Sequence, residues 1–238
     1  MSSYPARRSR QPANRPPAQP WKKGGEGKGS RYRDHGHYNA PALEYQLKEY
    51  PLQQGALEIQ YIEEYFTEFP RKKSATEILE RLEGRTCLIL MAEAQLPEDP
   101  GMVVPVSFKV LHELREHESD PKMFDLVERI RDVVDFSSKK VLYNWLGATR
   151  RDWRGQGFFR ALSEQQEEWA LDEGFDEIVV KTKNRYYDMR GTLDHLRYDV
   201  IKFEPHPEDN QESKVYMRKR LGERVRDNHR SSRKLSRS

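Results

Sequence analysis

Residues 150–162, RRDWRGQGFFRAL, hold the pattern that decides the fold. The apolar run KVLYNWLGAT precedes them, and a segment with apolar residues at helical spacing follows. A strand that passes through a glycine-rich loop into a helix is the geometry of a phosphate site, because the first N–H groups of a helix lack partners within it. Gly155 and Gly157 let a bulky diphosphate approach the backbone, and Arg154 adds a positive charge with a forked donor.

Two better-known phosphate motifs do not match this loop. A P-loop needs GxxxxGK followed by Ser or Thr, which the chain lacks. A dinucleotide-binding GxGxxG loop belongs beside an N-terminal strand, whereas this loop lies about two-thirds of the way along the chain. The sequence therefore favours a phosphate-binding loop of another kind.

The flanking sequence predicts one α/β domain with a mixed sheet and no internal repeat. Ser74 and Glu77 form a capping box at the start of one helix, and Gly84 and Gly174 are expected to end two helices. The predicted elements are a strand (42–50), helices (55–69 and 74–84), two strands joined by the turn QLPEDPG (86–94 and 103–113), a helix within an insertion (112–140), a strand (140–149), a helix (158–175), a strand (176–184), a helix-like segment (185–196) and two strands (198–204 and 213–221).

The insertion at about 112–140 contains DPKMFDLVERIRDVVDF, whose pattern predicts an amphipathic helix. Phe124, Val127, Ile130 and Val134 are expected on its buried side. This helix could cover an acceptor pocket, or it could pack on the outside of the domain.

Cysteine content and hydropathy narrow the class of protein further. The one cysteine, Cys87, stands in a strand-like apolar run, which predicts a buried, unreactive thiol, no disulfide and no cysteine cluster for zinc. No apolar run approaches the roughly 18 residues of a membrane helix, and the N-terminus lacks the apolar core of a signal peptide. These features predict a cytoplasmic protein with no membrane partner.

The net charge of +3 is unevenly distributed along the chain. Residues 1–36 and 218–238 each hold nine Lys or Arg and two acidic residues, which leaves about −11 for the residues between them. The basic ends, 1–40 and 222–238, are rich in Arg, Ser, Pro and Gly and are predicted to be disordered tails. They suit contact with nucleic acid or an acidic partner, and the alternative is a role in solubility alone.

The loop resembles the CoA-binding motif of the GNAT N-acetyltransferase superfamily, (Gln/Arg)-x-x-Gly-x-(Gly/Ala), at Arg154-Gly155-Gln156-Gly157-Phe158-Phe159. FDEIVVKTKN is similar to the family's fifth strand with its closing Asn, and the resemblance extends over residues 41–221. It implies a single GNAT-like α/β domain with a mixed, mostly antiparallel sheet flanked by helices.

The resemblance also implies a reaction, in which an amine takes an acetyl group directly from acetyl-CoA, with no metal. The six motif residues would hold the diphosphate, and Asn184 would bond the cofactor arm. Backbone N–H groups at Leu146, Ala148 and Thr149 would hold the thioester carbonyl. The acceptor would be a small-molecule or peptide amine.

The chain departs from the family pattern at three positions. Phe159 replaces the last Gly or Ala of the motif, and Arg197 replaces the Gly of a later LGF segment. Leu193 stands where many members have a general-acid Tyr. Tyr187 is the candidate acid, and the alternative is a tyrosine that packs on the cofactor or the core. His195 is expected to be exposed, and no residue is assigned as the base.

Two further functions compete with the plain enzyme. The domain could be a catalytically weak or inactive scaffold whose basic tails bind nucleic acid or an acidic partner. It could also be an acetyltransferase that the tails deliver to a substrate bound to nucleic acid.

Overall fold

The computed structural model describes residues 45–50, 52, 62, 73–96 and 98–235. The chain divides into two compact units, residues 1–40 and Pro41–Ser238, and the described residues all belong to the second unit. The tail predicted over 1–40 and the helix predicted over 55–69, apart from the buried helical residue Ile62, lie outside the described residues.

As far as the last described strand, the described helices and strands follow one another in the order that the sequence predicts, and a further helix comes after that strand. They are β1 (Tyr45–Tyr50), α2 (Ala75–Leu82), β2 (Cys87–Leu96), β3 (Asp99–Leu114), α3 (Pro121–Ile130), β4 (Val141–Thr149), the 3-10 turn η1 (Arg151–Trp153), α4 (Phe158–Asp172), β5 (Glu177–Lys183), α5 (Tyr187–His195), β6 (Asp199–Glu204), the 3-10 turn η2 (Asn210–Glu212), β7 (Lys214–Arg220) and α6 (Arg224–Leu235).

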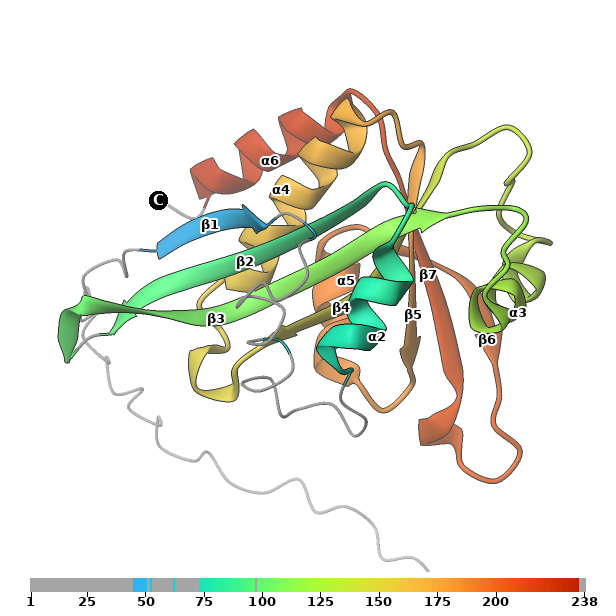
Figure 1. Ribbon diagram of the computed structural model, residues 1–238, viewed down its shortest axis with the longest axis horizontal. Coiled ribbons are helices and arrows are strands. Elements are labelled where there is room, and N and C mark those ends of the chain that lie inside the picture. Colours follow the sequence, from blue (N-terminus) through green and yellow to red (C-terminus); the bar gives the residue numbers. More distant parts are fainter. Residues whose placement is uncertain (1–44, 51, 53–61, 63–72, 97, 236–238) are drawn as a thin grey trace, which may run out of the picture. The chain divides into compact units, whose positions relative to one another are not determined.

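The described strands form one mixed sheet in the order β1-β2-β3-β4-β5-β7-β6 (Figure 1). β4 and β5 are parallel, and every other neighbouring pair is antiparallel. The single parallel pair is possible because α4 carries the chain back across one face of the sheet. The mixed, mostly antiparallel sheet is therefore confirmed.

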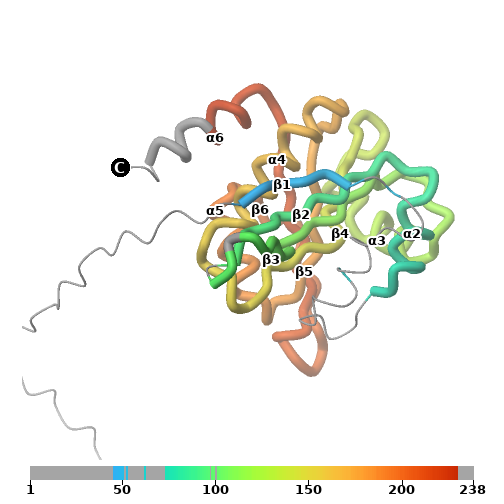
Figure 2. The backbone as a smooth tube through the Cα atoms, turned by 60° about the vertical axis from the view of Figure 1, so that its left-hand side comes forward, coloured from blue at the N-terminus to red at the C-terminus, as the bar shows by residue number. Residues whose placement is uncertain are grey.

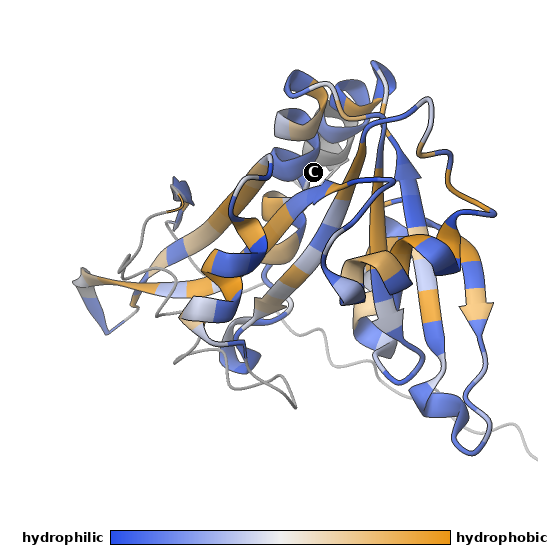
Figure 3. Cartoon of the chain, turned by 45° about the vertical axis from the view of Figure 1, so that its right-hand side comes forward, coloured by the Kyte–Doolittle hydropathy of each residue, from blue (hydrophilic) through white to orange (hydrophobic). Residues whose placement is uncertain are grey.

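Helices cover both faces of the sheet. Phe158 and Leu162 of α4 and Leu193 of α5 pack on one face with Leu142 and Ile178 of β4 and β5. On the opposite face, α2 covers β2 and β3, and α3 covers β4, β5 and β7. Figure 3 shows long hydrophobic stretches along the central strands, between these layers.

Local signals for helix ends are confirmed at one helix start and two helix ends. Ser74 and Glu77 form the complete capping box of α2, with Ser74 Oγ accepting from Glu77 N at 3.1 Å. Gly84 and Gly174 have φ of +66° and +75°, the left-handed conformation that glycine adopts without strain. These ends depend on neighbours in sequence, which is why the sequence locates them.

Two details of the inserted segment and the hairpin are corrected. Phe124 was expected on the buried side of α3 but is 51% exposed, and Met123 takes its place in the core. The helix begins at Pro121, after the N-cap Asp120, and this start places Met123 toward the sheet. In the hairpin, β2 continues to Leu96 and β3 begins at Asp99, so the turn is shorter than QLPEDPG.

The C-terminal boundary is also corrected, because residues 224–235 of the expected tail form the helix α6. Figures 1 and 2 both place α6 beside α4. Val225 and His229 are buried, and Arg226 forms an ion pair with Asp172 at the end of α4. The mean composition of the segment predicts disorder, but two buried side chains and charge pairs to α4 hold it in a helix.

Candidate functional site

β4 and β5 stop pairing part-way along their length. Their ladder ends at Asn144 and Val180, although β4 runs on to Thr149 and β5 to Lys183. Trp145 is an extra residue in the β3–β4 register, a bulge that lies directly after the last β4–β5 pair. We call the part of β4 and β5 beyond this last pair the strand fork, because bulges bend a strand and end its pairing.

Backbone N–H groups of β4 face the strand fork at alternate residues. Arg150 N donates to the backbone of β3 at 2.9 Å. Hydrogen-bonded and non-hydrogen-bonded residue pairs alternate along an antiparallel ladder. Every second residue back from Arg150 therefore also directs its N–H group to β3, and these residues are Ala148 and Leu146. Those of Thr149 and Gly147 are directed to the open edge at the strand fork. Thr149 is held there by its hydroxyl, which lies 2.8 Å from Ser107 Oγ.

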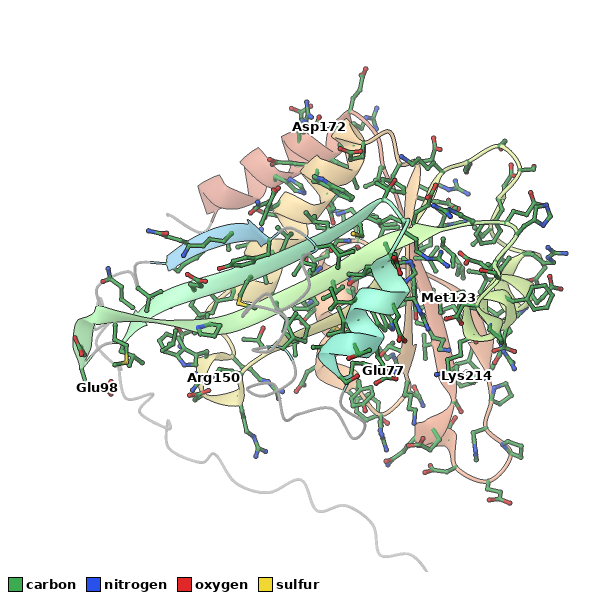
Figure 4. All side chains as sticks on the ribbon, viewed as in Figure 1. Glu77, Glu98, Met123, Arg150, Asp172 and Lys214 are labelled. Atoms are coloured by element: carbon green, nitrogen blue, oxygen red, sulfur yellow. The ribbon has the colours of Figure 1, made fainter. Side chains whose placement is uncertain are left out.

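The glycine-rich loop joins the end of β4 to the start of α4, with Arg150 at its beginning (Figure 4). Gly155 and Gly157 have φ of +79° and +86°, and nothing lies within 4 Å of where a Cβ would stand on either. Gly157 is the N-cap and offers no side chain to the free N–H groups of the first turn. Arg154 lies at the same turn, with Nε donating to the Thr149 carbonyl at 3.2 Å.

The two phenylalanines of the motif lie in different environments. Phe158 is 2% exposed and packs against Tyr45 and Trp153, so only its backbone is available to a ligand. Phe159 turns toward β4, where its Cε2 atom lies 3.2 Å from the position that a Cβ on Gly147 would occupy. Gly147 therefore creates the space for the phenylalanine that replaces Gly or Ala in the motif. A glycine inside a strand indicates such a close approach, and this signal was missed.

Asn184 ties three segments together beyond the end of β5. Its backbone N–H donates to Ser213 O at 2.8 Å, and its side-chain Nδ2 donates to Asn210 O at 3.1 Å. Its Oδ1 accepts from Arg190 of α5. The side chain is therefore engaged at both ends, and it fixes the loop before β7 against α5.

The candidate acid Tyr187 is 60% exposed at the first position of α5, with the Arg190 guanidinium carbon 5.7 Å from its ring centre. Leu193 is fully buried in the core beside α4, so a packed side chain stands where the resemblance would place a general acid. His195 is exposed, as expected, and its Nδ1 lies 2.7 Å from Gly191 O.

Arg197 stands in the left-handed region, with φ of +63°. Tyr198 N donates to Leu193 O at 3.0 Å and Arg197 N donates to Asp194 O at 2.8 Å, which together form the Schellman motif at the end of α5. The residue at this point of the motif is usually Gly. The backbone of the LGF segment is thus kept although its glycine is not.

A buried polar network lies under α4 and was not foreseen. Lys109 of β3 is fully buried, and its Nζ donates to Ser163 Oγ at 2.6 Å and Gln166 Oε1 at 2.7 Å. The same Nζ lies 4.3 Å from the centre of the Phe159 ring. Burial lowers the pKa of Lys109 to about 7. Polar residues on the buried side of a helix give no sign in sequence of which strand will satisfy them.

A second part of this network connects α4 to β7 and α6. Glu167 is fully buried, and Lys219 Nζ donates to its two oxygens at 2.7 and 2.6 Å. His229 Nε2 donates to Glu167 at 2.7 Å, and its Nδ1 lies 3.2 Å from Glu168. Burial alone lowers the pKa of His229, but its hydrogen bonds to Glu167 and Glu168 outweigh this and raise it above the usual value.

The thiol of Cys87 is half-buried at the start of β2, and burial raises its pKa, which makes it a poor nucleophile. In the described part of the chain, no three His, Cys, Asp or Glu residues are grouped so as to hold a metal ion. None of the described helices has the length and hydrophobicity to cross a membrane.

These features define a class of α/β protein in which a parallel strand pair parts beside the glycine-rich start of a helix. Solved structures with a similar fold include a putative acetyltransferase and two structures that contain acetyl-CoA or CoA. NAA60 of Arabidopsis thaliana in complex with acetyl-CoA is 9% identical, covers 75% of this chain and 99% of its own, and has a TM-score of 0.56. The NatC complex bound to Gag peptide and CoA is 12% identical, covers 75% of this chain and 99% of its own, and has a TM-score of 0.52. A putative acetyltransferase of the GNAT family from Desulfovibrio desulfuricans is 12% identical, covers 75% of this chain and 100% of its own, and has a TM-score of 0.52.

The chain therefore has the GNAT acetyltransferase fold. No protein-family model and no curated protein sequence matches it.

Proposed function

We propose that the protein is an acetyl-CoA-dependent N-acetyltransferase that transfers an acetyl group to an amine by direct attack. The observation that carries this proposal is the strand fork, which opens directly beside the uncapped, glycine-started N-terminus of α4. One end of such a site suits a diphosphate and the other suits an acyl group on an extended arm.

The residues present fit the donor. Open space above Gly155 and Gly157 admits a diphosphate to the free N–H groups of Phe158 and Phe159, and Arg154 lies at the same turn. Gln156 is exposed in the same loop. Phe159 contributes backbone here, because its ring is turned toward β4.

When bound, acetyl-CoA supplies an activated thioester. The N–H groups of Thr149 and Gly147 are the donors that point into the strand fork, so they are proposed to hold the acyl carbonyl oxygen. Leu146 and Ala148 contribute through the backbone conformation they impose, since their own N–H groups are directed to β3. Asn184 is proposed to position the loop before β7 rather than to bond the cofactor arm directly.

The acceptor is proposed to be a peptide or small-molecule amine that reaches the strand fork from the face opposite α4. The NatC structure carries a Gag peptide together with CoA, which supports a peptide amine as the first class to test. A reducing compartment such as the cytoplasm suits a chain with one half-buried cysteine.

Thermal unfolding of the full chain with and without acetyl-CoA tests donor binding. A ligand that binds only the folded state, at about 100 times its Kd, adds roughly 2.7 kcal/mol to the free energy of unfolding. For a protein of this size, this raises the unfolding temperature by roughly 5 to 10 °C. Gly157→Glu should remove the shift, because it places a carboxylate at the diphosphate. Gly174→Glu is the matched control, since it has the same left-handed strain at the other end of α4 and should keep the shift.

Transfer is then followed as CoA release with peptides, polyamines and amino sugars as acceptors. Acetyl-CoA binding with release that depends on an added amine supports the enzyme. If neither acetyl-CoA nor CoA shifts the unfolding temperature of the wild type, the proposal is wrong.

A scaffold with little or no activity is the second candidate. Leu193 favours it, because this buried side chain fills the place of the family's acid and the alternative, Tyr187, is largely exposed. On this hypothesis the basic ends of the chain bind nucleic acid or an acidic partner. Donor binding without transfer to any amine, together with salt-dependent binding to RNA, would favour the scaffold.

A further inference from the structure

Lys181 is the first residue of β5 beyond its pairing with β4. The last pair joins Asn144 to Val180, so Lys181 lies at the start of the strand fork. Val180 packs on the α4 side of the sheet and Val179 on the α3 side. Because side chains alternate along a strand, Lys181 points to the α3 side, which is the side proposed for the acceptor. Its side chain reaches solvent, although neighbouring atoms surround much of it.

The charged groups around Lys181 are already paired with one another. They are Asp125 and Arg129 of α3, Glu204 of β6 and Lys214 of β7. Arg129 bonds Asp125 at 2.8 Å and Glu204 at 3.0 Å, and Lys214 lies 3.3 Å from Glu204 (its position on β7 is labelled in Figure 4). Among the described residues, Lys181 has no carboxylate within ion-pair distance.

This environment favours the neutral form of the Lys181 amine more than that of an ordinary surface lysine. Partial burial lowers its pKa, and the positive charge of Lys214 lowers it further. The neutral amine is the form that attacks a carbonyl, so a larger share of Lys181 is reactive near neutral pH. An unpaired side chain is also free to reorient toward the strand fork.

We propose that Lys181 is a self-acetylation site, which takes the acetyl group from acetyl-CoA bound in the strand fork. The inference rests on the proposed function. The Nζ lone pair attacks the thioester carbonyl carbon, a C–N bond forms, and the C–S bond breaks. The amine proton passes through solvent to the departing sulfur, so the products are Nζ-acetyl-lysine and the CoA thiol.

The modification changes the acceptor side of the strand fork. It removes one positive charge from a place that an amine acceptor must approach, and it adds the bulk of an acetyl group there. Because an amide is far more stable than a thioester, the acetyl group stays on Lys181. Self-acetylation is therefore a lasting mark on the acceptor route and not a step of each turnover.

The test is to incubate the full chain with acetyl-CoA and map acetylated lysines by mass spectrometry. We expect the mass of one acetyl group at Lys181, its loss in Lys181→Arg, and its retention in Lys202→Arg. Lys202 is the matched control, because it lies on β6 and is paired with Asp132 at 2.9 Å. Gly157→Glu should also abolish the mark. Acetylation that persists in Gly157→Glu, or that is spread equally over Lys202 and other lysines, would be non-enzymatic acetylation and would overturn the inference.

A second measurement does not depend on turnover. Trace labelling with acetic anhydride should modify Lys181 faster than Lys202, and unacylated CoA should shield Lys181 alone. If CoA raises the unfolding temperature and an added amine is acetylated, but Lys181 is neither marked nor shielded, the inference fails and the proposed function stands. If CoA does not bind at all, both are overturned.

Discussion

Removing the carboxylate of Glu167 is expected to destabilise the protein more than any other single charge change on α4. Glu167 is fully buried and accepts hydrogen bonds from Lys219 of β7 and His229 of α6. Glu167→Gln keeps the size of the side chain but leaves the buried Lys219 amine without its carboxylate and His229 with only the partly exposed Glu168. Breaking a buried pair by removing one partner costs about 3–5 kcal/mol, because the remaining charge stays desolvated.

The loss is measured by urea denaturation of the full chain at pH 6, where His229 is protonated in the folded state. For a protein of this size, the same loss lowers the unfolding temperature by roughly 6 to 20 °C. The effect should be accompanied by faster amide exchange in α6, because the buried His229 joins this helix to α4.

Glu168→Gln is the matched control, since Glu168 is adjacent on α4 and contacts the other ring nitrogen of His229 at 3.2 Å. Its side chain is 42% exposed, so its removal is expected to cost about 1 kcal/mol or less. Equal losses for the two variants, or a loss below about 1 kcal/mol for Glu167→Gln, would refute the idea that a buried charge network holds α6 to α4.

Three more variants probe the backbone, the histidine and the packing at the strand fork. Arg197→Gly should raise the free energy of unfolding by about 1 kcal/mol or less, because relief of left-handed strain outweighs the entropy cost of glycine. Arg131→Gly is the control: Arg131 has a φ of −64°, so its replacement should lower the free energy of unfolding in the same denaturation assay. The pKa of His229 is raised in the folded state, so the stabilisation by protonated His229 is complete below about pH 6.5 and is lost as the pH rises through the raised pKa. Plots of the free energy of unfolding against pH for wild type and His229→Gln should therefore converge above that pKa. A constant difference between the two plots would contradict this. Gly147→Ala should weaken acetyl-CoA binding in the thermal-shift assay, because its Cβ would press on the Phe159 ring and the Phe108 carbonyl. Phe159→Leu in the same chain should restore part of the binding, and an unchanged shift in the single variant would show that Gly147 does not set this packing.

Much of the fold follows from local sequence signals, and the structure confirms those that depend on close neighbours. The capping box at Ser74 and Glu77, the left-handed Gly174 and the strand, loop and helix order around Gly155 and Gly157 are examples. A cap or a turn is set by residues within one helical turn of one another, so sequence contains nearly all the information about it. The glycine-rich loop could therefore be placed at the start of α4 from sequence alone.

Tertiary structure decided what lies between segments that are distant in sequence. The helix α6 exists because His229 meets Glu167, and Phe159 fits the motif because Gly147 lies opposite it on β4. No pattern of spacing indicated that Lys181 would lie at the strand fork with none of the described carboxylates within ion-pair distance. The burial of a polar or aromatic side chain depends on which distant atoms satisfy it, and strand order and register, which set those neighbours, are properties of the assembled sheet. The sequence by itself thus determined the succession of elements and the loop, and the packed sheet determined the chemistry of the groups around it.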